Sequence, residues 1–339
     1  MEKLKAILSK IKYYRVICLS LSLIFLAIGI ITNIILNAGR NKYDDQTMSA
    51  RWDSEGSSAH ISMFIKDIAH FTKNDIEGLE YELNKQLDLN SIEAPNEDAR
   101  RFVDCYMAKS SITLETEQNT IDVECMAVGG DFFLFHPIRL ASGSYFAGSD
   151  LTYDGIILDE ATAWRLFGSS NIVGQKVLFG DRVLFIKGVY KREDDKVHYY
   201  ARGDKPEIYV PFDLLDSADA PLDIVSFEVC MPNPIENFAN KIITDIVKLD
   251  TSNFEVVNNS ERFTIENLWK LYKGKKYRSM QNRDIIYPYW EKIARFQEDR
   301  LSPYAVVMCV TYISSATIFL CLVLYEVSKL TRLRSRNDD

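Results

Sequence analysis

The sequence predicts an α+β extracytoplasmic domain held between two transmembrane α-helices. Two observations lead to this prediction. Residues 16–39 and residues 301–325 form apolar runs without any charged residue, and short strand and helix signals alternate between them. Each run is long enough to cross a hydrocarbon core of about 30 Å as a helix that rises about 1.5 Å per residue.

Short basic flanks predict the orientation of the two spans. Residues 1–15 hold one acid, Glu2, against Lys3, Lys5, Lys10, Lys12 and Arg15. After the second run, four basic residues follow within eight positions: Lys329, Arg332, Arg334 and Arg336. Short basic segments stay on the cytoplasmic side of a membrane. We therefore expect residues 1–15 and 326–339 to be cytoplasmic and residues 40–300 to lie outside a bacterial plasma membrane.

A cleaved signal peptide is the alternative interpretation of the first apolar run. The run is longer than the 7–15 apolar residues typical of a signal peptide, and Asn37-Ala38-Gly39 matches an A-x-A cleavage site poorly. We therefore favour a permanent anchor, with transmembrane helices at residues 16–39 and 301–325 and the lipid bilayer as a partner.

The charge of the predicted domain excludes one class of partner. The chain has 40 Lys and Arg against 48 Asp and Glu. Residues 41–301 alone hold 30 basic and 44 acidic residues, which gives 30 − 44 = −14. A domain this acidic is poorly suited to nucleic acid, so we expect no nucleic-acid partner.

Six cysteines do not form a disulfide framework. Three of them fall in the predicted spans, and Cys105, Cys125 and Cys230 fall in the domain, an odd number without CxxC spacing. Cys105 and Cys125 either form a bridge in an oxidising exterior or fill apolar core positions.

The first half of the domain shows a strand, a helix and a strand pair. Residues 59–65 are rich in strand formers, and residues 74–87 repeat apolar positions at helical spacing behind a Thr72 start signal. Residues 111–117 and 120–128 alternate like paired strands around a Gln118-Asn119 turn.

The second half repeats this strand and helix alternation. We predict strands at 154–158, 224–231 and 254–258, a hairpin of 176–179 with 183–190 around Gly180-Asp181, and helices at 160–167 and 235–249. Strand–helix signals thus occur early and late with a β-rich block between them. This order indicates two βα halves that pair in space and carry an insertion.

The segment before the second run has a helical apolar face. Trp290, Ile293 and Leu301 lie on that face, and the polar Gln297 interrupts it. We predict one helix that continues into the membrane, with Pro303 marking the point where it enters or a mild kink. Such a helix is a lever, mechanically connected to the domain, whereas a flexible tether is rich in Gly and Ser. We also expect an outer aromatic belt of Tyr287, Tyr289, Trp290 and Tyr304.

The sequence lacks the motifs of common enzyme classes. It has no P-loop, no G-x-G-x-x-G, no H-E-x-x-H and no G-x-S-x-G. The segment Glu193-Asp194-Asp195 with His198 is either a metal site or a solvated loop, and we favour the loop because the order does not match a calcium loop. We expect no catalytic residue, no cofactor and no metal.

An ordered series of motifs resembles the periplasmic core domain of MacB-type (MacB-like or FtsX-like) ABC transporter permeases. The stretches that carry the resemblance are GGDFFLFHPIRLASGSYFAGSD, DGIILDEATAWRLFG, NIVGQKVLFGDRVLFIKGVYKRED and EIYVPFDLL. With one span before the domain and one after it, the resemblance covers nearly the whole chain.

The resemblance implies a Porter-like subdomain of two βα halves with an inserted β-rich Sabre-like subdomain at about residues 129–215. We expect Gly129, Gly143, Gly168, Gly174 and Gly188 to be turn or helix-stop glycines. The motif residues are expected to have structural roles: Gly130, Asp131, Phe132, Phe133, Gly143, Phe146, Asp150, Asp159, Ala163, Leu166, Phe167, Gly168, Gly174, Gly188 and Val189.

The resemblance also implies a noncatalytic membrane subunit that couples an ATPase to an extracytoplasmic domain for export or mechanotransmission. Permeases of this family continue past their second span, whereas this chain ends soon after Leu330. We therefore expect a cytoplasmic ABC ATPase and a fuller permease subunit as partners. A stand-alone anchored binding or sensing module is the alternative function, and an envelope enzyme built from distant carboxylates is a third.

Overall fold

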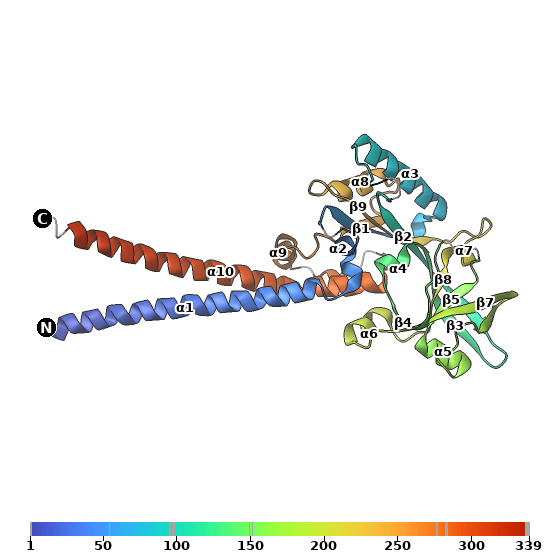
Figure 1. Ribbon diagram of the computed structural model, residues 1–339, viewed down its shortest axis with the longest axis horizontal. Coiled ribbons are helices and arrows are strands. Elements are labelled where there is room, and N and C mark those ends of the chain that lie inside the picture. The colour runs from blue at the N-terminus through green and yellow to red at the C-terminus, as the bar shows by residue number, and fades with distance from the viewer. Residues whose placement is uncertain are drawn as a thin grey trace. The chain divides into compact units, whose positions relative to one another are not determined.

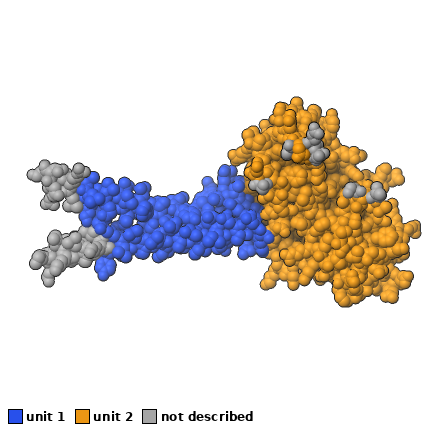
Figure 2. Space-filling view, viewed as in Figure 1, with its two compact units in different colours: residues 1–42, 263–278, 297–339 blue, residues 43–262, 279–296 orange. Residues whose placement is uncertain are grey.

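The computed structural model describes residues 2–53, 55–94, 96, 99–148, 150, 152–275, 277–281 and 284–335. The predicted cytoplasmic residue Arg336 lies outside these residues. The chain divides into two compact units, coloured separately in Figure 2. We call residues 43–262 and 279–296 the sheet unit, and residues 1–42, 263–278 and 297–339 the helical unit.

The sheet unit is built on one mixed sheet of ten strands. The strand order is β10-β1-β9-β2-β3-β8-β5-β7-β4, and β6 pairs with β2 and β7. The strands are β1 (Ser58–Ile65), β2 (Val103–Glu115), β3 (Thr120–Gly130), β4 (Arg139–Gly143), β5 (Gly155–Asp159), β6 (Lys176–Phe179), β7 (Arg182–Lys191), β8 (Glu207–Pro211), β9 (Ile224–Pro232) and β10 (Phe254–Asn258).

Two strand–helix–strand halves form one end of this sheet. The first half is β1, α3 (Lys73–Leu89) and β2, and the second is β9, α8 (Phe238–Ile246) and β10. In the sheet β1, from the first half, lies between β10 and β9, which both come from the second half. The strands of the two halves are therefore hydrogen-bonded to one another. Helices α3 and α8 contact each other, as Figure 1 also shows. The predicted two-halves architecture is confirmed.

Strands β3 to β8 lie between the two halves in the chain. β3 pairs antiparallel with β2 through the predicted turn, and it runs parallel to β8. β5 pairs parallel with β7, and β6 and β7 form the predicted hairpin. The short helices α4 (Phe132–Phe135), α5 (Glu160–Phe167), α6 (Lys196–Arg202) and α7 (Phe212–Leu215) connect these strands.

Each face of the sheet has its own hydrophobic cluster. One cluster joins the sheet to α3, α5, α7 and α8. The other joins it to α2 (Met48–Trp52), α4 and the first turns of α10 (Tyr289–Ser335). Cys125 belongs to the first cluster and Cys105 to the second, and both are free thiols. The interpretation as a bridge is therefore wrong, because side chains on opposite faces of a sheet cannot be linked.

The helical unit contains the two apolar runs. α1 (Glu2–Arg40) and α10 include segments of 28 and 44 residues that are long and apolar enough to cross a membrane. The hydroxyl groups of Ser22 and Ser315 lie 3.1 Å apart, and Arg15 pairs with Glu326 at 2.6 Å. Gln297, which interrupts the predicted apolar face, donates to the carbonyl oxygen of Gly39 at 3.0 Å. Pro303 lies inside α10, and its role at the membrane entry or at a kink stays a prediction.

Two sequence predictions about helices and aromatic residues need correction. Helix α8 is shorter than the predicted 235–249, because Asn237 adopts a left-handed conformation (φ 63°) and Val247 is extended. Tyr287, Tyr289 and Trp290 do not form an exposed belt. They are 2–7 % exposed within the sheet unit. Their rings pack in the hydrophobic clusters of the sheet unit.

The glycine prediction is also only partly right. Gly168 ends α5 in the left-handed region (φ 66°), as a helix-stop residue does. Gly129 and Gly188 instead lie inside β3 and β7. A Cβ on Gly129 would lie 2.3 Å from the Tyr106 ring, so this glycine makes room for an aromatic side chain.

Candidate functional site: the anchorage of α10 and a polar cleft

A buried carboxylate in β9 receives four polar side chains. Glu228 is 1 % exposed. Its Oε2 lies 2.7 Å from His60 Nε2 and accepts a hydrogen bond from Ser62 at 2.8 Å. Its Oε1 accepts from Trp290 Nε1 at 2.6 Å and lies 3.1 Å from His136 Nε2. These contacts join β1, α10 and the segment after α4 at one group.

His136 is held between two carboxylates. Its Nδ1 lies 2.8 Å from Asp45 and its Nε2 lies 3.1 Å from Glu228. An ionised carboxylate only accepts, so with Asp45 and Glu228 ionised both ring nitrogens carry hydrogen and the imidazole is a cation. The ring also stacks on Trp290 with centroids 4.0 Å apart.

The pKa values of this pair move in opposite directions. Burial favours neutral imidazole, but the charge of Glu228 and the hydrogen bonds to Asp45 and Glu228 outweigh it and raise the pKa of His136 to about 9. Burial likewise opposes ionisation of Glu228, yet the charge and hydrogen bonds of His136 and then His60 hold its pKa well below the usual range. The pair is ionised at neutral pH.

A second buried cluster holds the next turn of α10. Glu291 receives two hydrogen bonds from Arg262, at 2.8 and 3.1 Å. Arg295 donates to Glu291 at 2.6 Å and to Glu255 at 2.7 Å. Tyr287 donates to the same oxygen of Glu255 at 2.5 Å, and its ring lies under the Arg295 guanidinium at 3.8 Å.

Together these clusters fix the first turns of α10 to the sheet unit. We call them the α10 clamp, defined by His60, His136, Glu228, Glu255, Arg262, Trp290, Glu291 and Arg295. Paired and hydrogen-bonded charges inside a protein tolerate displacement poorly, because a separated partner stays buried and uncompensated. The clamp therefore holds the first turns of α10 against the sheet unit.

The clamp makes stability depend on pH in a predictable direction. The pKa of His136 is about 9 in the folded chain, against about 6.5 for an unperturbed histidine. Its contribution to stability is therefore fully present below pH 6.5 and is lost as the pH rises through 9. The lowered pKa of Glu228 adds stability above its unfolded pKa that is lost as the pH falls.

Melting temperatures of the parent and His136→Gln, measured from pH 5 to pH 10, test this prediction. Asp104 also titrates, because burial and the nearby Glu80 and Asp131 raise its pKa to about 7, so the difference between the two chains is the relevant quantity. We expect that difference to shrink steadily above pH 6.5. A difference independent of pH would contradict the charged state of His136.

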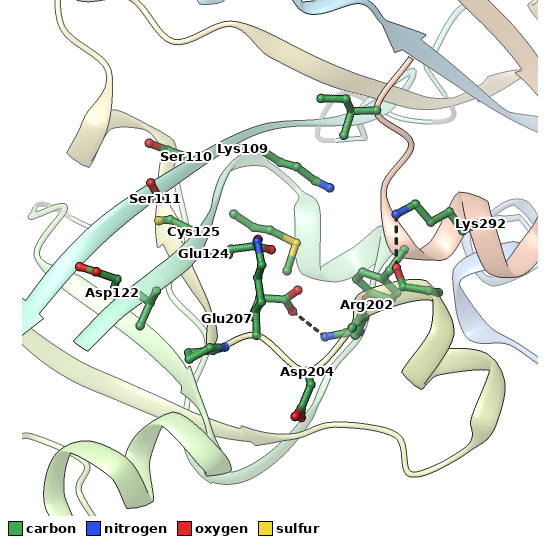
Figure 3. Close-up of a pocket in the computed structure, with 18 residues that line it drawn as sticks. Lys109, Ser110, Ser111, Asp122, Glu124, Cys125, Arg202, Asp204, Glu207 and Lys292 are labelled. Carbon is green, nitrogen blue, oxygen red and sulfur yellow. Dashed lines mark hydrogen bonds and ion pairs between the residues drawn. The ribbon is translucent and has the colours of Figure 1, made fainter. Parts of the chain in front are cut away.

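A polar cleft with a cavity volume of about 1110 Å³ opens on the sheet unit, and Figure 3 shows its lining. β2 and β3 form one wall, and the segment after α6 and the first turn of α10 form the other. The ammonium groups of Lys109 and Lys292 point into the same space. Burial and then the charge of Lys292 lower the pKa of Lys109, although its side chain stays accessible to water.

Four acidic residues also line the cleft, Asp122, Glu124, Asp204 and Glu207, and two of them are paired. Arg202 pairs with Glu207 at 2.8 Å, and Lys205 pairs with Glu124 at 2.5 Å. Lys292 makes one long contact, 3.4 Å to the carbonyl oxygen of Ala201. Among the described residues neither Lys109 nor Lys292 forms an ion pair, so the cleft presents their two ammonium groups beside its acidic side chains.

The predicted motif residues occupy structural positions. Phe132, Phe133 and Phe146 pack in the cluster with α10, and Ala163, Leu166 and Phe167 pack in the opposite one. Val189 is fully buried in β7. Gly130, Gly143 and Gly174 have φ values of 65°, 84° and 83°.

The three motif aspartates hold local structure. Asp159 is buried and caps α5 by accepting from the Thr162 amide at 2.5 Å. Asp131 pairs with Arg100 at 2.5 Å, and Asp150 pairs with Lys187. Arg192, directly after β7, pairs with Asp159. Each of the three aspartates thus links neighbouring segments of the fold, and the three do not form one site.

Of the predicted lever residues, Trp290 and Ile293 pack in the sheet unit, and Leu301 packs in the helical unit. Sequence reasoning missed the clamp residues on the strands. The available signal was Glu228 within an otherwise apolar strand, where a charge is expected only if it is paired.

The acidic segment before α6 differs from the predicted solvated loop, because part of it forms a helix cap. Asp195 accepts from the backbone amides of Val197 and His198 at 2.8 and 3.0 Å and so caps the helix. His198 is 5 % exposed, which corrects the solvated interpretation for this residue.

Three comparisons relate the chain to known proteins. The family model of the MacB-like periplasmic core domain matches residues 20–231. Searching curated proteins gave no significant match. The periplasmic region of MacB from Actinobacillus actinomycetemcomitans is 17 % identical, with 62 % of this chain and 93 % of that chain covered and a TM-score of 0.43.

Two further solved structures are similar. The extracellular domain of the noncanonic ABC-type transporter YknZ from Gram-positive bacteria is 18 % identical, with 59 % and 100 % covered and a TM-score of 0.40. A domain of a putative permease from Porphyromonas gingivalis is 10 % identical, with 59 % and 89 % covered and a TM-score of 0.34. Because the family model matches more than half of the residues of this chain, the chain belongs to the family of the MacB-like periplasmic core domain.

Proposed function

We propose that this protein is a noncatalytic membrane subunit of an ABC-type complex, in which a separate cytoplasmic ATPase moves the extracytoplasmic domain. Membership of a family named for a periplasmic domain supports a domain outside the cytoplasm. The basic flanks support cytoplasmic termini. Protease added to intact spheroplasts should then cut the domain and spare a tag at either end of the chain. Cleavage of the tags would show that the termini lie outside and would contradict this orientation.

The α10 clamp is the observation that carries the coupling proposal. A helix that begins in a buried network and continues through an apolar run is a stiff connection. Movement of the second span would then displace the start of α10, and the clamp would pass that displacement to β1, β9 and β10. ATP hydrolysis itself is assigned to the partner.

Association with the energy source is the first requirement of this proposal. An affinity-tagged full chain, extracted in mild detergent, should copurify with an ABC ATPase and a permease with more spans. A variant with the second run replaced by an unrelated membrane helix is the control, because it keeps the anchor and changes the surface that the partners contact. Recovery of the parent without either partner would contradict the proposal.

The polar cleft favours a second candidate function, binding of an acidic peptide by an anchored module. Lys109 and Lys292 supply two close positive charges in a space large enough for a peptide segment. A labelled oligoglutamate peptide should bind the full chain and bind less tightly to Lys109→Gln and Lys292→Gln. The matched control is Lys241→Gln, on an exposed face of α8. Equal affinity of the peptide for the parent and all three variants would show that the cleft is not the peptide-binding site.

A further inference from the structure

Helix α9 (Ile265–Gly274) has an apolar face that the rest of the described chain leaves uncovered. Ile265, Trp269 and Tyr272 recur at i, i+4 and i+7, and their side chains are 41 %, 37 % and 50 % exposed. Thr264 caps the helix by accepting from the Asn267 amide at 3.3 Å. The helix is thus well defined, and its apolar side faces outward.

The same helix is fixed to the outer ends of the two apolar runs. Leu268, fully buried, and Phe263 belong to one cluster with Leu36 of α1 and with Leu301, Ala305 and Met308 of α10. Leu36 lies near the end of the first uncharged run and Leu301 begins the second. By composition this is the level at which the runs leave the hydrocarbon for the headgroup region.

The charge of the α9 segment differs from that of the domain around it. Residues 265–278 contain five Lys and Arg against one acid, Glu266, whereas residues 41–301 as a whole have a net charge of −14. Lys273 follows Trp269 by four residues and so lies beside it on the helix surface, and Lys270 pairs with Glu266 at 2.7 Å. Lysine side chains with Trp and Tyr beside them are typical of helices in the membrane interface.

The direction of the helix fits the same location. In Figure 1 α9 is seen nearly end-on, while α1 and α10 extend along the page. Its axis therefore crosses the direction of the two apolar helices, with which it shares the helical unit. A helix that crosses the spans at their outer ends lies along the membrane surface.

We infer that α9 is an interfacial helix, whose Ile265, Trp269 and Tyr272 insert into the outer leaflet of the membrane that the spans cross. Lys270, Lys273 and Lys275 bind the phosphate groups of anionic lipids. The helix fixes the depth and rotation of the second span where α10 enters the membrane. The family model ends at residue 231, so this feature belongs to the part of the chain beyond the match. The inference rests on membrane anchorage and does not require an ATPase.

Tryptophan quenching by brominated lipids tests this inference on the full chain. The parent, Trp269→Phe and Trp164→Phe are each reconstituted alone into vesicles of phosphatidylcholine and phosphatidylglycerol brominated near the top of the acyl chain. Phenylalanine keeps an apolar side chain, so the first variant removes the probe and not the helix. Trp164, 58 % exposed on α5 of the sheet unit, supplies the matched control.

We expect Trp269→Phe to lose most of the lipid quenching and Trp164→Phe to keep it. Raising the phosphatidylglycerol fraction should increase the quenching of the parent but not of a Lys270→Glu, Lys273→Glu, Lys275→Glu variant. Equal quenching of the parent and Trp269→Phe, with Trp269 quenched by aqueous iodide instead, would overturn the inference. That outcome would assign the apolar face to a protein partner absent from the vesicles. Failure of the ATPase proposal would leave lipid quenching unchanged, so the two results are distinguishable.

Discussion

Glu228→Gln is expected to destabilise the folded chain by about 3–5 kcal/mol, the cost of removing one partner from a buried ion pair. The carboxylate accepts from Ser62 and Trp290 and neutralises His136. An amide has no charge and one acceptor oxygen, so the imidazolium would keep only Asp45 as a counter-charge. For a domain of this size the melting temperature should fall by roughly 6–20 °C.

The matched control is Glu124→Gln, the same chemical change on the same sheet. Glu124 pairs with Lys205 at the surface, where its side chain is 47 % exposed. Exposed pairs contribute about 0–1 kcal/mol, so this variant should melt within a few degrees of the parent. Similar melting temperatures for the two variants would show that the buried network does not hold the sheet unit together.

A flexible insertion in α10 is expected to abolish ATP-driven movement of the domain while leaving expression and folding intact. Seven Gly and Ser residues placed between Phe296 and Gln297 would follow the clamp and precede the apolar run. Glycine in a helix interior costs about 0.5–1 kcal/mol per residue relative to alanine, so the inserted segment would not stay helical. Force applied to the span would then bend the insertion rather than move the clamp.

A helical insertion of equal length separates stiffness from distance. Seven residues rich in Ala, Glu and Lys extend α10 by two turns with a rotation of about 20°. This variant should retain the domain movement that the Gly-Ser variant loses. Movement in both variants would contradict the lever, and loss in both would show that the exact spacing matters instead.

Most strands and helices were predictable because their periodicity depends on residues that are close together in the sequence. The hairpin at Gly180-Asp181 and the β10 boundaries followed from turn chemistry and alternation. The order of the ten strands depends on contacts between residues far apart in the chain, and a single sequence does not record them. The early and late strand–helix signals indicated two halves with an insertion, and the resemblance to MacB-type permeases implied the same arrangement.

The clamp was largely hidden from sequence reasoning for the same reason. Arg262 and Glu291 are separated by 29 residues, and His136 and Glu228 by 92. Apart from Glu228, which lies in a mostly apolar strand, each charged residue of the clamp resembles a surface charge when the sequence is considered alone. Trp290 was predicted to face the membrane interface because of its position beside an apolar run, but its indole nitrogen found a buried carboxylate partner.

The most direct test of the proposed coupling is a distance measured between this chain and the proposed ATPase partner during turnover. A fluorophore at position 200, where Tyr200 is 83 % exposed on α6, reports the domain, and a second fluorophore reports the ATPase in the purified complex. The account predicts that the distance changes when ATP is added and returns after hydrolysis. A distance that stays constant while the ATPase hydrolyses ATP would contradict it.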